Sequence, residues 1–318
     1  MTTSTAQGID TFGGLANETN FQDFQADTAG LPNSPVLKII TKNVRGLKTD
    51  ERILELLNEL KKLTNWDILI LNETWRLDGF EMFATDEGHL FCNAGCEAGR
   101  HGVGFLVHKR WTKWLKGFTP VSERVACLTL QKQKMKIKIV GVYFPHSGYP
   151  DDAVQELYDK LECILYESRA SREHVVITGD FNAEIGTRRD IDIQRLIGPW
   201  SVGDQNYRGF WLKRWCELNE LTVANTLFPK RRESIITYIG PNKHERQIDF
   251  ALVTKKTRRI LRNCGSTREV DMNSDHFAVE IISDLTTQKK KKRKLKQRRN
   301  AKLVSWKKCG SGTVWCKD

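Results

Sequence analysis

The stretch "VVITGDFNAEIG", residues 175–186, joins an apolar strand to a polar end. The four residues 175–178 are β-branched, which predicts a buried strand. The strand then runs into Gly-Asp-Phe-Asn, so a carboxylate (Asp180) stands two positions before a carboxamide (Asn182). A turn would explain this pair without any function, because Asp and Asn side chains bond to nearby backbone groups. The alternative is a strand end that presents both side chains to a ligand.

Strands and helices alternate through the body of the chain. Apolar residues share one face in the segments 50–63, 151–170 and 209–221, which predicts three helices. The expected strands are 36–43, 67–73, 102–109, 124–130, 136–144, 174–180, 234–240, 247–253 and 276–283. This alternation favours an α/β (α+β) fold, and the hairpin-like pairs favour mixed sheets. Two such sheets packed face to face, with helices outside, fit the strand count.

The formal charge of +12 is concentrated near the end of the 318-residue chain. The run "KKKKRKLKQRR" (289–299) holds nine basic residues and no acids, which leaves 12 − 9 = +3 for the rest. We therefore expect a polar, disordered leader at 1–35, one folded domain at 36–285 and a basic, disordered tail at 286–318. The basic run predicts a nuclear location or non-specific binding to nucleic acid. Without that signal a cytoplasmic protein is expected.

Other sequence features exclude several classes of protein. No apolar run is long enough to cross a membrane, and the first residues lack the basic start and apolar stretch of a secretory signal. The eight cysteines are scattered, so reduced thiols are expected. Cys309 and Cys316 lack the spacing of a zinc site, and we assign no role to them or to Trp306 and Trp315. We expect a monomer without membrane contact.

Polar side chains recur at the ends of the expected strands. An acid inside an apolar run, such as Asp249, is costly unless it is paired or bound to a metal. Each polar residue alone has a plain structural explanation as a turn, a cap or an ion pair. Their recurrence at strand ends is harder to explain that way. The set is Asn43, Glu73, Tyr143, Asp180, Asn182, Asp249, Ser274, Asp275 and His276.

The residue types in this set narrow the chemistry. The chain has no GxxxxGK[ST] phosphate loop, no HExxH motif and no evident Ser/His or Cys/His pair. Carboxylate and amide oxygens are the ligands that Mg²⁺ or Mn²⁺ prefers. A metal on acidic ligands, with His and Asn to hold anionic oxygens, is suited to hydrolysis of phosphate esters.

Six motifs also resemble those of a known family, in the same order along the chain. They are "TKNVRGL", "ILNETW", "VYFP", "GDFNAEIG", "SIITYIGPNKHERQIDFALV" and "SDHFAV". The family is the endonuclease/exonuclease/phosphatase superfamily with the DNase I-like fold. The chain most resembles the endonuclease domains of non-LTR retrotransposons and craniofacial development protein 2-like proteins, over about residues 36–284. The resemblance implies a four-layer sandwich with the active site at one rim.

The resemblance also implies which residues hold a metal and activate water. Glu73 would be the main Mg²⁺ ligand, with Asn43 close by. Asp275 would lie beside the metal or the catalytic histidine. Asp180 would position or deprotonate the attacking water, and Asn182 would orient that water or the phosphate.

A second group of residues is implied to act on the phosphate. His276 would contact the scissile phosphate, with Asp249 holding its working tautomer. Tyr143 would bond to a phosphate oxygen or to the leaving group. Thr237 and Ser274 would support these residues.

Two positions depart from the pattern of the family. Arg45 stands where AP-endonuclease members carry an acid, which favours a single metal and argues against abasic-site repair as the main role. Asn72 precedes Glu73, where many relatives carry a different residue, and we expect that change to be tolerated. Arg45 also places a cation near the path of a phosphate. Further basic residues in expected loops that could follow a DNA backbone are Arg188, Arg189, Lys230, Arg231, Arg232, Lys243 and Arg246.

Three functions remain open on the sequence alone. The leading hypothesis is a Mg²⁺-dependent DNA endonuclease of retrotransposon origin that leaves a 3′-hydroxyl and a 5′-phosphate. The second is a phosphatase or phosphodiesterase that acts on a small phosphoester or on RNA. The third is a domesticated, non-catalytic protein that binds nucleic acid, for which loss of Glu73, Asp180 or His276 would be the signature. All three residues are present.

Overall fold

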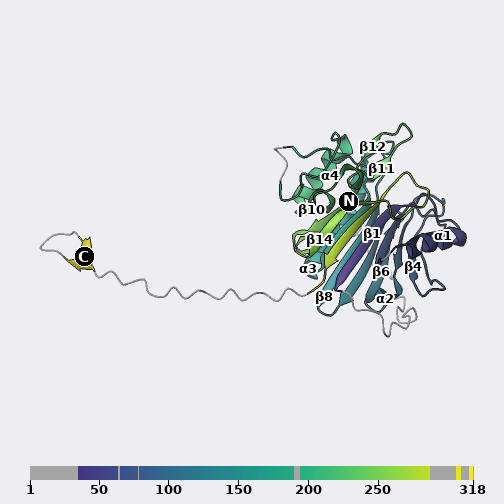
Figure 1. Ribbon diagram of the computed structural model, residues 1–318, viewed down its shortest axis with the longest axis horizontal. Helices are drawn as coiled ribbons and strands as arrows, with labels where there is room; N and C mark the ends of the chain where they lie inside the picture. The colour runs from purple at the N-terminus through teal and green to yellow at the C-terminus, as the bar shows by residue number, and fades with distance from the viewer. Residues whose placement is uncertain are drawn as a thin grey trace, which may run out of the picture. The chain divides into compact units, whose positions relative to one another are not determined.

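The computed structural model describes residues 35–63, 65–77, 79–189 and 194–286, and two short strands at 306–308 and 315–317. The chain forms a body that ends at Leu285 and a separate unit that begins at Thr286. The body holds two large β-sheets, a small two-stranded sheet and the helices that cover the large sheets (Figure 1). None of the helices in the described part of the chain is long and apolar enough to span a membrane.

The larger sheet has seven strands in the order β14-β15-β1-β2-β5-β4-β3. β1 and β2 are parallel, and β15 runs antiparallel to β1 on its other side. The strands are β1 (Val36–Asn43), β2 (Ile68–Asn72), β3 (Glu81–Ala84), β4 (Leu90–Ala94), β5 (Val103–Val107), β14 (Leu261–Thr267) and β15 (Ala278–Asp284).

The smaller sheet has six strands in the order β10-β13-β9-β8-β7-β6. β8 and β9 are parallel, whereas β13 runs antiparallel to β9. As expected, β7 and β8 form an antiparallel pair. The strands are β6 (Leu115–Ser122), β7 (Val125–Lys132), β8 (Met135–Tyr143), β9 (His174–Asp180), β10 (Leu221–Val223) and β13 (Asp249–Thr254).

Helices cover the outer faces of both sheets. The two inner faces pack on each other through apolar residues such as Ile39, Ile70, Ile139 and Val176. Outside the larger sheet lies α1 (Asp50–Lys61), and outside the smaller sheet lie α3 (Asp151–Ala170) and α4 (Tyr207–Leu218). This confirms the predicted four-layer sandwich. The short elements are α2 (Lys109–Thr112), η2 (Ala224–Thr226), η3 (Arg232–Ser234), β11 (Tyr238–Ile239), β12 (Glu245–Arg246) and α5 (Lys255–Arg258).

Some element boundaries differ from those expected. The strand expected at 234–240 is reduced to β11, because the preceding residues form η3 and a turn. The helix expected at 209–221 begins two residues earlier, where the Asn206 side chain accepts a hydrogen bond from the Gly209 backbone N–H at 2.7 Å. The strands β3, β4, β6, β10 and β14 were not predicted, because they are short or carry polar residues at several positions.

The segment after the body contains one short hairpin, in which β16 (Trp306–Lys308) pairs antiparallel with β17 (Trp315–Lys317). No element was predicted there. The basic run 289–299 and all but the last residue of the leader expected at 1–35 lie outside the described residues.

Candidate active site

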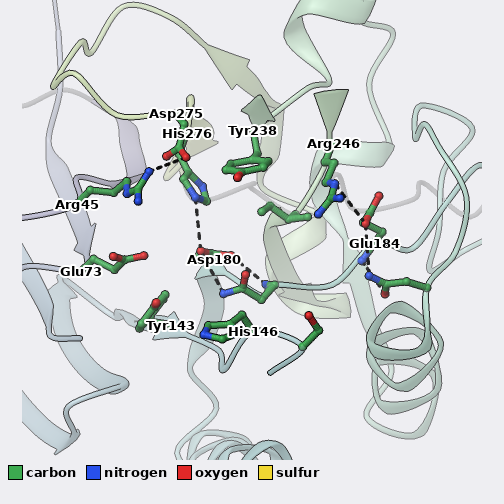
Figure 2. A pocket seen from close by; sticks show the side chains of 14 residues that line it. Arg45, Glu73, Tyr143, His146, Asp180, Glu184, Tyr238, Arg246, Asp275 and His276 are labelled. Carbon is green, nitrogen blue, oxygen red and sulfur yellow. Dashed lines mark hydrogen bonds and ion pairs between the residues drawn. The ribbon is translucent and has the colours of Figure 1, made fainter. Parts of the chain in front are cut away.

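The polar strand-end residues meet at one rim between the two sheets. Asn43 shares the inner face of β1 with Ile39, and Asp180 shares the inner face of β9 with Val176, because side chains alternate along a strand. The parallel pairing of β8 with β9 sets Tyr143 opposite Asp180. The antiparallel pairing of β13 with β9 brings the first residue of β13 to the same level. Strands far apart in sequence thus deliver their polar ends to one place (Figure 2).

A chain of charged side chains crosses this rim. His276 Nδ1 lies 3.0 and 3.2 Å from the two carboxylate oxygens of Asp249. On the other side of the ring, His276 Nε2 lies 3.8 Å from Asp180 Oδ2. All three side chains are buried. The order is therefore Asp249, His276, Asp180. Of these, His276 and Asp180 line the hollow (Figure 2).

Two hydroxyl groups hold this chain in place. Thr237 Oγ1 accepts hydrogen bonds from the backbone N–H groups of Ile248 and Asp249 at 2.9 and 3.0 Å. Ser274 Oγ donates to the Asn43 carbonyl oxygen at 2.7 Å and accepts from the His276 N–H at 3.2 Å. The two residues that the family resemblance implied as supporting thus contact the backbone of Asp249 and of His276.

Glu73 follows β2 and points into the hollow from the larger sheet. Its backbone is left-handed, with φ 56°, which is uncommon for a residue other than glycine. The Glu73 carbonyl accepts a hydrogen bond from Gly46 at 2.8 Å, and the carboxylate accepts one from Asn43 Nδ2 at 2.7 Å. The same amide nitrogen donates to Asp180 Oδ2 at 3.1 Å. Asn43 therefore links the acid of one sheet to the acid of the other.

Asn72 lies at the end of β2, directly before Glu73. The side chain is fully buried, and its Nδ2 donates to the Val142 carbonyl at 2.8 Å. β2 and β8 belong to different sheets, so this bond joins the two layers next to the rim.

The Gly-Asp-Phe-Asn segment is both a turn and part of the site. Gly179 has φ 152°, and a Cβ at this position would lie 1.9 Å from the Val142 carbonyl oxygen, so only glycine fits. Asp180 Oδ1 accepts from the Asn182 backbone N–H at 2.9 Å, as in an Asx turn. Asp180 Oδ2 faces the hollow, and Asn182 lines the same hollow.

Asp275 and Arg45 form an ion pair at the opening. Arg45 Nη1 lies 2.7 Å from Asp275 Oδ2. The second oxygen, Oδ1, is buried and has no hydrogen-bond partner among the described residues. A buried carboxylate oxygen without a partner is costly, and a cation beside it would remove that cost. Glu73 and Asp275 line the same hollow, and carboxylate oxygens are donors that suit a hard divalent cation.

Burial and neighbouring charges shift the pKa values of the site. Burial raises the pKa of Asp180 to about 7, with Asp249 adding to the effect and His276 opposing it. Burial by itself lowers the pKa of His276, but the carboxylates of Asp249 and Asp180 outweigh it and raise the pKa to about 9. Burial, together with the carboxylates of Glu73 and Asp180, raises the pKa of the Tyr143 phenol. The phenol therefore keeps its proton and can act as a hydrogen-bond donor. Near neutral pH these shifts favour a protonated His276 ring beside an Asp180 carboxyl group whose pKa is close to the pH.

The three members of the charged chain also offer ligand atoms within 4.8 Å of one another. A cation centred there would compete with the hydrogen bond between His276 Nδ1 and Asp249, and the neighbouring carboxylates raise the pKa of His276, which favours the protonated ring. An anionic oxygen suits the imidazolium better.

The structure places few of the expected DNA-contacting residues in the hollow. Arg45 and Arg246 line it, on opposite sides of Asp180 (Figure 2). Arg189 bonds to Gln205, and Arg232 pairs with Glu245 at 2.8 Å. The residues expected near DNA that do not line the hollow are Arg188, Arg189, Lys230, Arg231, Arg232 and Lys243.

Several residues of the site were missed by sequence reasoning. His146 and Tyr238 line the hollow, and the Tyr238 ring lies 4.9 Å from that of His276. Lys42 is buried and donates to the His276 carbonyl at 2.7 Å, and burial lowers its pKa. The position of Lys42 next to Asn43 in the sequence was the one signal that could have identified it as a residue of the site. His146 lies in a loop, so only the tertiary structure brings it to the site.

Solved structures of nucleases share this fold. The endonuclease domain of TRAS1, a telomere-specific non-LTR retrotransposon, matches with a TM-score of 0.55 and 14% identity, over 80% of this chain and 100% of that domain. An AP endonuclease from Archaeoglobus fulgidus matches with a TM-score of 0.55 and 17% identity, over 78% of this chain and 99% of that one. The fold is therefore the DNase I-like sandwich that the motifs implied.

A sequence model of the Endonuclease/Exonuclease/phosphatase family matches residues 40–284, and the chain belongs to this family. Craniofacial development protein 2 of Bos taurus is 25% identical over 237 residues, which is 74% of this chain and 39% of that protein. The same protein of Tragulus javanicus is 26% identical over 74% of this chain and 40% of its own length. The matched region thus spans about two fifths of these curated relatives. The family resemblance is confirmed.

Proposed function

We propose that the chain is a divalent-metal-dependent phosphodiesterase that nicks DNA and leaves a 3′-hydroxyl and a 5′-phosphate. The observation that carries the proposal is the Asp249–His276–Asp180 chain, which opens into the same hollow as Glu73. On one side of the hollow, Asp180 can act as a base for water and the protonated His276 ring can donate to a phosphate. On the other side, the Glu73 carboxylate is suited to bind a metal.

Asp180 is the group that takes the proton from the attacking water. Its Oδ2 faces the hollow, and its raised pKa of about 7 matches a base that works near neutral pH. Asn182 and Asn43, both bonded to this carboxylate, keep it oriented.

His276 stabilises the charge that develops on the phosphate. The protonated ring directs Nε2 toward the position that a phosphate oxygen takes, while Asp249 holds Nδ1. The phenolic O–H of Tyr143, which also lines the hollow, donates a hydrogen bond to a second phosphate oxygen or to the leaving group.

Mg²⁺ or Mn²⁺ is the cofactor that fits the oxygen donors on the Glu73 side. Glu73 and Asp275 would hold it, with Asn43 bonded to Glu73. When bound, the ion supplies positive charge that stabilises the phosphorane-like transition state.

The open alternatives fit the site less well. A non-catalytic role would leave the buried charged chain and the left-handed Glu73 without a use, although both carry an energetic cost. Arg45 and Arg246 on opposite sides of Asp180 favour a substrate whose backbone continues in both directions, rather than a small phosphoester.

Nicking of supercoiled plasmid tests the proposal. The parent protein should convert plasmid to the open circle with Mg²⁺, and EDTA should abolish this until Mg²⁺ is restored. Glu73→Gln should lose most of the activity, and Lys116→Gln, an exposed charge on β6, is the control. Undiminished nicking in EDTA would overturn the metal dependence. Faster hydrolysis of a phosphoinositide, of RNA or of an abasic oligonucleotide than of intact DNA would overturn the assigned substrate.

A further inference from the structure

A second hollow of about 600 Å³ adjoins the catalytic one on the Glu73 side. The two share Glu73, Tyr143 and His146, so they are continuous at the proposed metal ligand. We call the second hollow the Trp75 groove, and its own walls include Lys48, Trp75, Arg100, His101 and Tyr149. The proposed catalytic steps use none of these five residues.

Trp75 is presented to the groove by a strained backbone. It has φ 57°, a left-handed conformation that is an outlier for a bulky side chain, and its N–H donates to the His101 carbonyl at 2.8 Å. One part of the ring packs on Gly46, where a Cβ would lie 2.8 Å from Trp75 Cε3. The ring is only half-buried and lines the groove, although a buried position would stabilise the fold more.

Two exposed cations flank the ring. Lys48 Nζ lies 5.9 Å from the centre of the Trp75 ring, and Arg100 lines the same groove. Neither forms a salt bridge within the part of the chain that the structure describes. Glu73 is the sole acid among the lining residues described for the groove. The groove therefore combines an aromatic face with unpaired positive charge.

The far wall is preorganised by a third cation. Arg124 is buried between Tyr143 and Tyr149, with its guanidinium carbon 5.0 and 4.9 Å from the two ring centres. Its Nη2 donates to His101 Nε2 at 2.8 Å. Because a guanidinium only donates, Nε2 must accept, and the ring proton sits on Nδ1. Nδ1 is buried and has no hydrogen-bond partner among the described residues.

We propose that the Trp75 groove binds the nucleotide that flanks the scissile phosphate on the same strand. The base stacks on Trp75, and the adjoining phosphate lies between Lys48 and Arg100. This inference rests on the proposed function and narrows its substrate to a polynucleotide. A small phosphoester has no base that could stack on Trp75. A sugar–phosphate backbone without bases would contact only Lys48 and Arg100.

The affinity for a base tests the groove without any cleavage. Fluorescence anisotropy in EDTA would compare a labelled 12-nucleotide oligo(dT) with a strand of the same length made of abasic residues. Stacking of one base on an aromatic side chain changes affinity on the order of tenfold. The parent should therefore bind oligo(dT) about ten times more tightly than the abasic strand. Trp75→Leu should lose this preference and bind both strands alike.

Three further variants make the result specific. Trp75→Phe keeps an aromatic face and should keep most of the preference, whereas Trp75→Met keeps bulk against Gly46 and should lose it. Trp114→Leu is the matched control, because Trp114 is also half-buried and has Lys113 4.6 Å from its ring centre. It adjoins α2, which lies at the end of the body remote from β11 and β12 (Figure 1).

An equal preference for oligo(dT) in the parent and in both Trp75→Leu and Trp75→Met would overturn the assignment of the groove. Equal binding of the two strands by the parent would show a contact with the backbone alone and would also overturn it. Neither result depends on catalysis, so the groove can fail while plasmid nicking succeeds. A protein that shows the Trp75-dependent preference but does not nick would refute the proposed function and retain the groove.

Discussion

Replacing Asp180 by Asn separates a catalytic role from a structural one. Oδ1 accepts a backbone N–H from Asn182, and an amide oxygen can do the same. Oδ2 accepts from Asn43 Nδ2 at 3.1 Å and faces the His276 ring at 3.8 Å. An amide NH₂ in that position would face these donors and could not take a proton from water. Asp180→Asn therefore keeps the turn and removes the base.

The structure sets the size of both effects. General base catalysis contributes about 10²- to 10⁴-fold, so kcat should fall by at least about 100-fold. The folded carboxyl has its pKa raised from 3.8 to about 7, so its contribution to stability is present below pH 3.8 and is lost as the pH rises through 7. At pH 8 the penalty is the free energy of ionising a buried carboxyl group, less the attraction between this carboxylate and the His276 ring. The uncharged variant avoids it but leaves amide donors unpaired, at about 1–3 kcal/mol.

The variant should therefore lose at least about 100-fold in kcat and remain folded at pH 8. Single-turnover nicking of a labelled duplex at saturating Mg²⁺ measures the first effect, and denaturant unfolding at pH 8 measures the second. His276→Ala should also lower kcat, and the double variant should lose far less than the product of the single losses. A folded Asp180→Asn protein that nicks at the parent rate would refute the assignment of the base. A large loss of stability together with the loss of activity would point to a structural role.

Two further predictions concern other parts of the chain. Burial lowers the pKa of His108 to about 3, against 6.5 when unfolded, so its contribution to stability is present above pH 6.5 and is lost as the pH falls toward 3. His108→Asn, which can still accept the Arg110 N–H at the start of α2, should flatten the decline of Tm between pH 7 and 4, and an unchanged slope would contradict this. Deleting the chain after Leu285, and with it the basic run 289–299, should weaken DNA binding and reduce its dependence on salt without lowering the Tm of the body. Unchanged binding and unchanged cellular location would rule out the proposed role of that run.

The sequence determined the strands that carry the site and the identity of most of its polar groups. The β-branched residues of β9 predict a buried strand. Asp180 is recognisable as a candidate site residue because it follows directly after this apolar run. The order of the motifs also indicated the family and the sandwich. These signals are local, since they depend on residue type and on spacing of a few positions.

Tertiary structure alone decided which residues share the site and which cations line it. His146, Tyr238 and the Trp75 groove depend on contacts between loops that are far apart in sequence, and periodicity carries no information about such contacts. The expected DNA-contacting arginines look alike in sequence, yet Arg45 lines the hollow and Arg232 pairs with Glu245 away from it. The register of β1 with β2, and of β8 and β13 with β9, sets which polar ends meet. The physical reason is that a one-residue slip in any of these pairings would turn an inward polar side chain to the opposite face of its sheet.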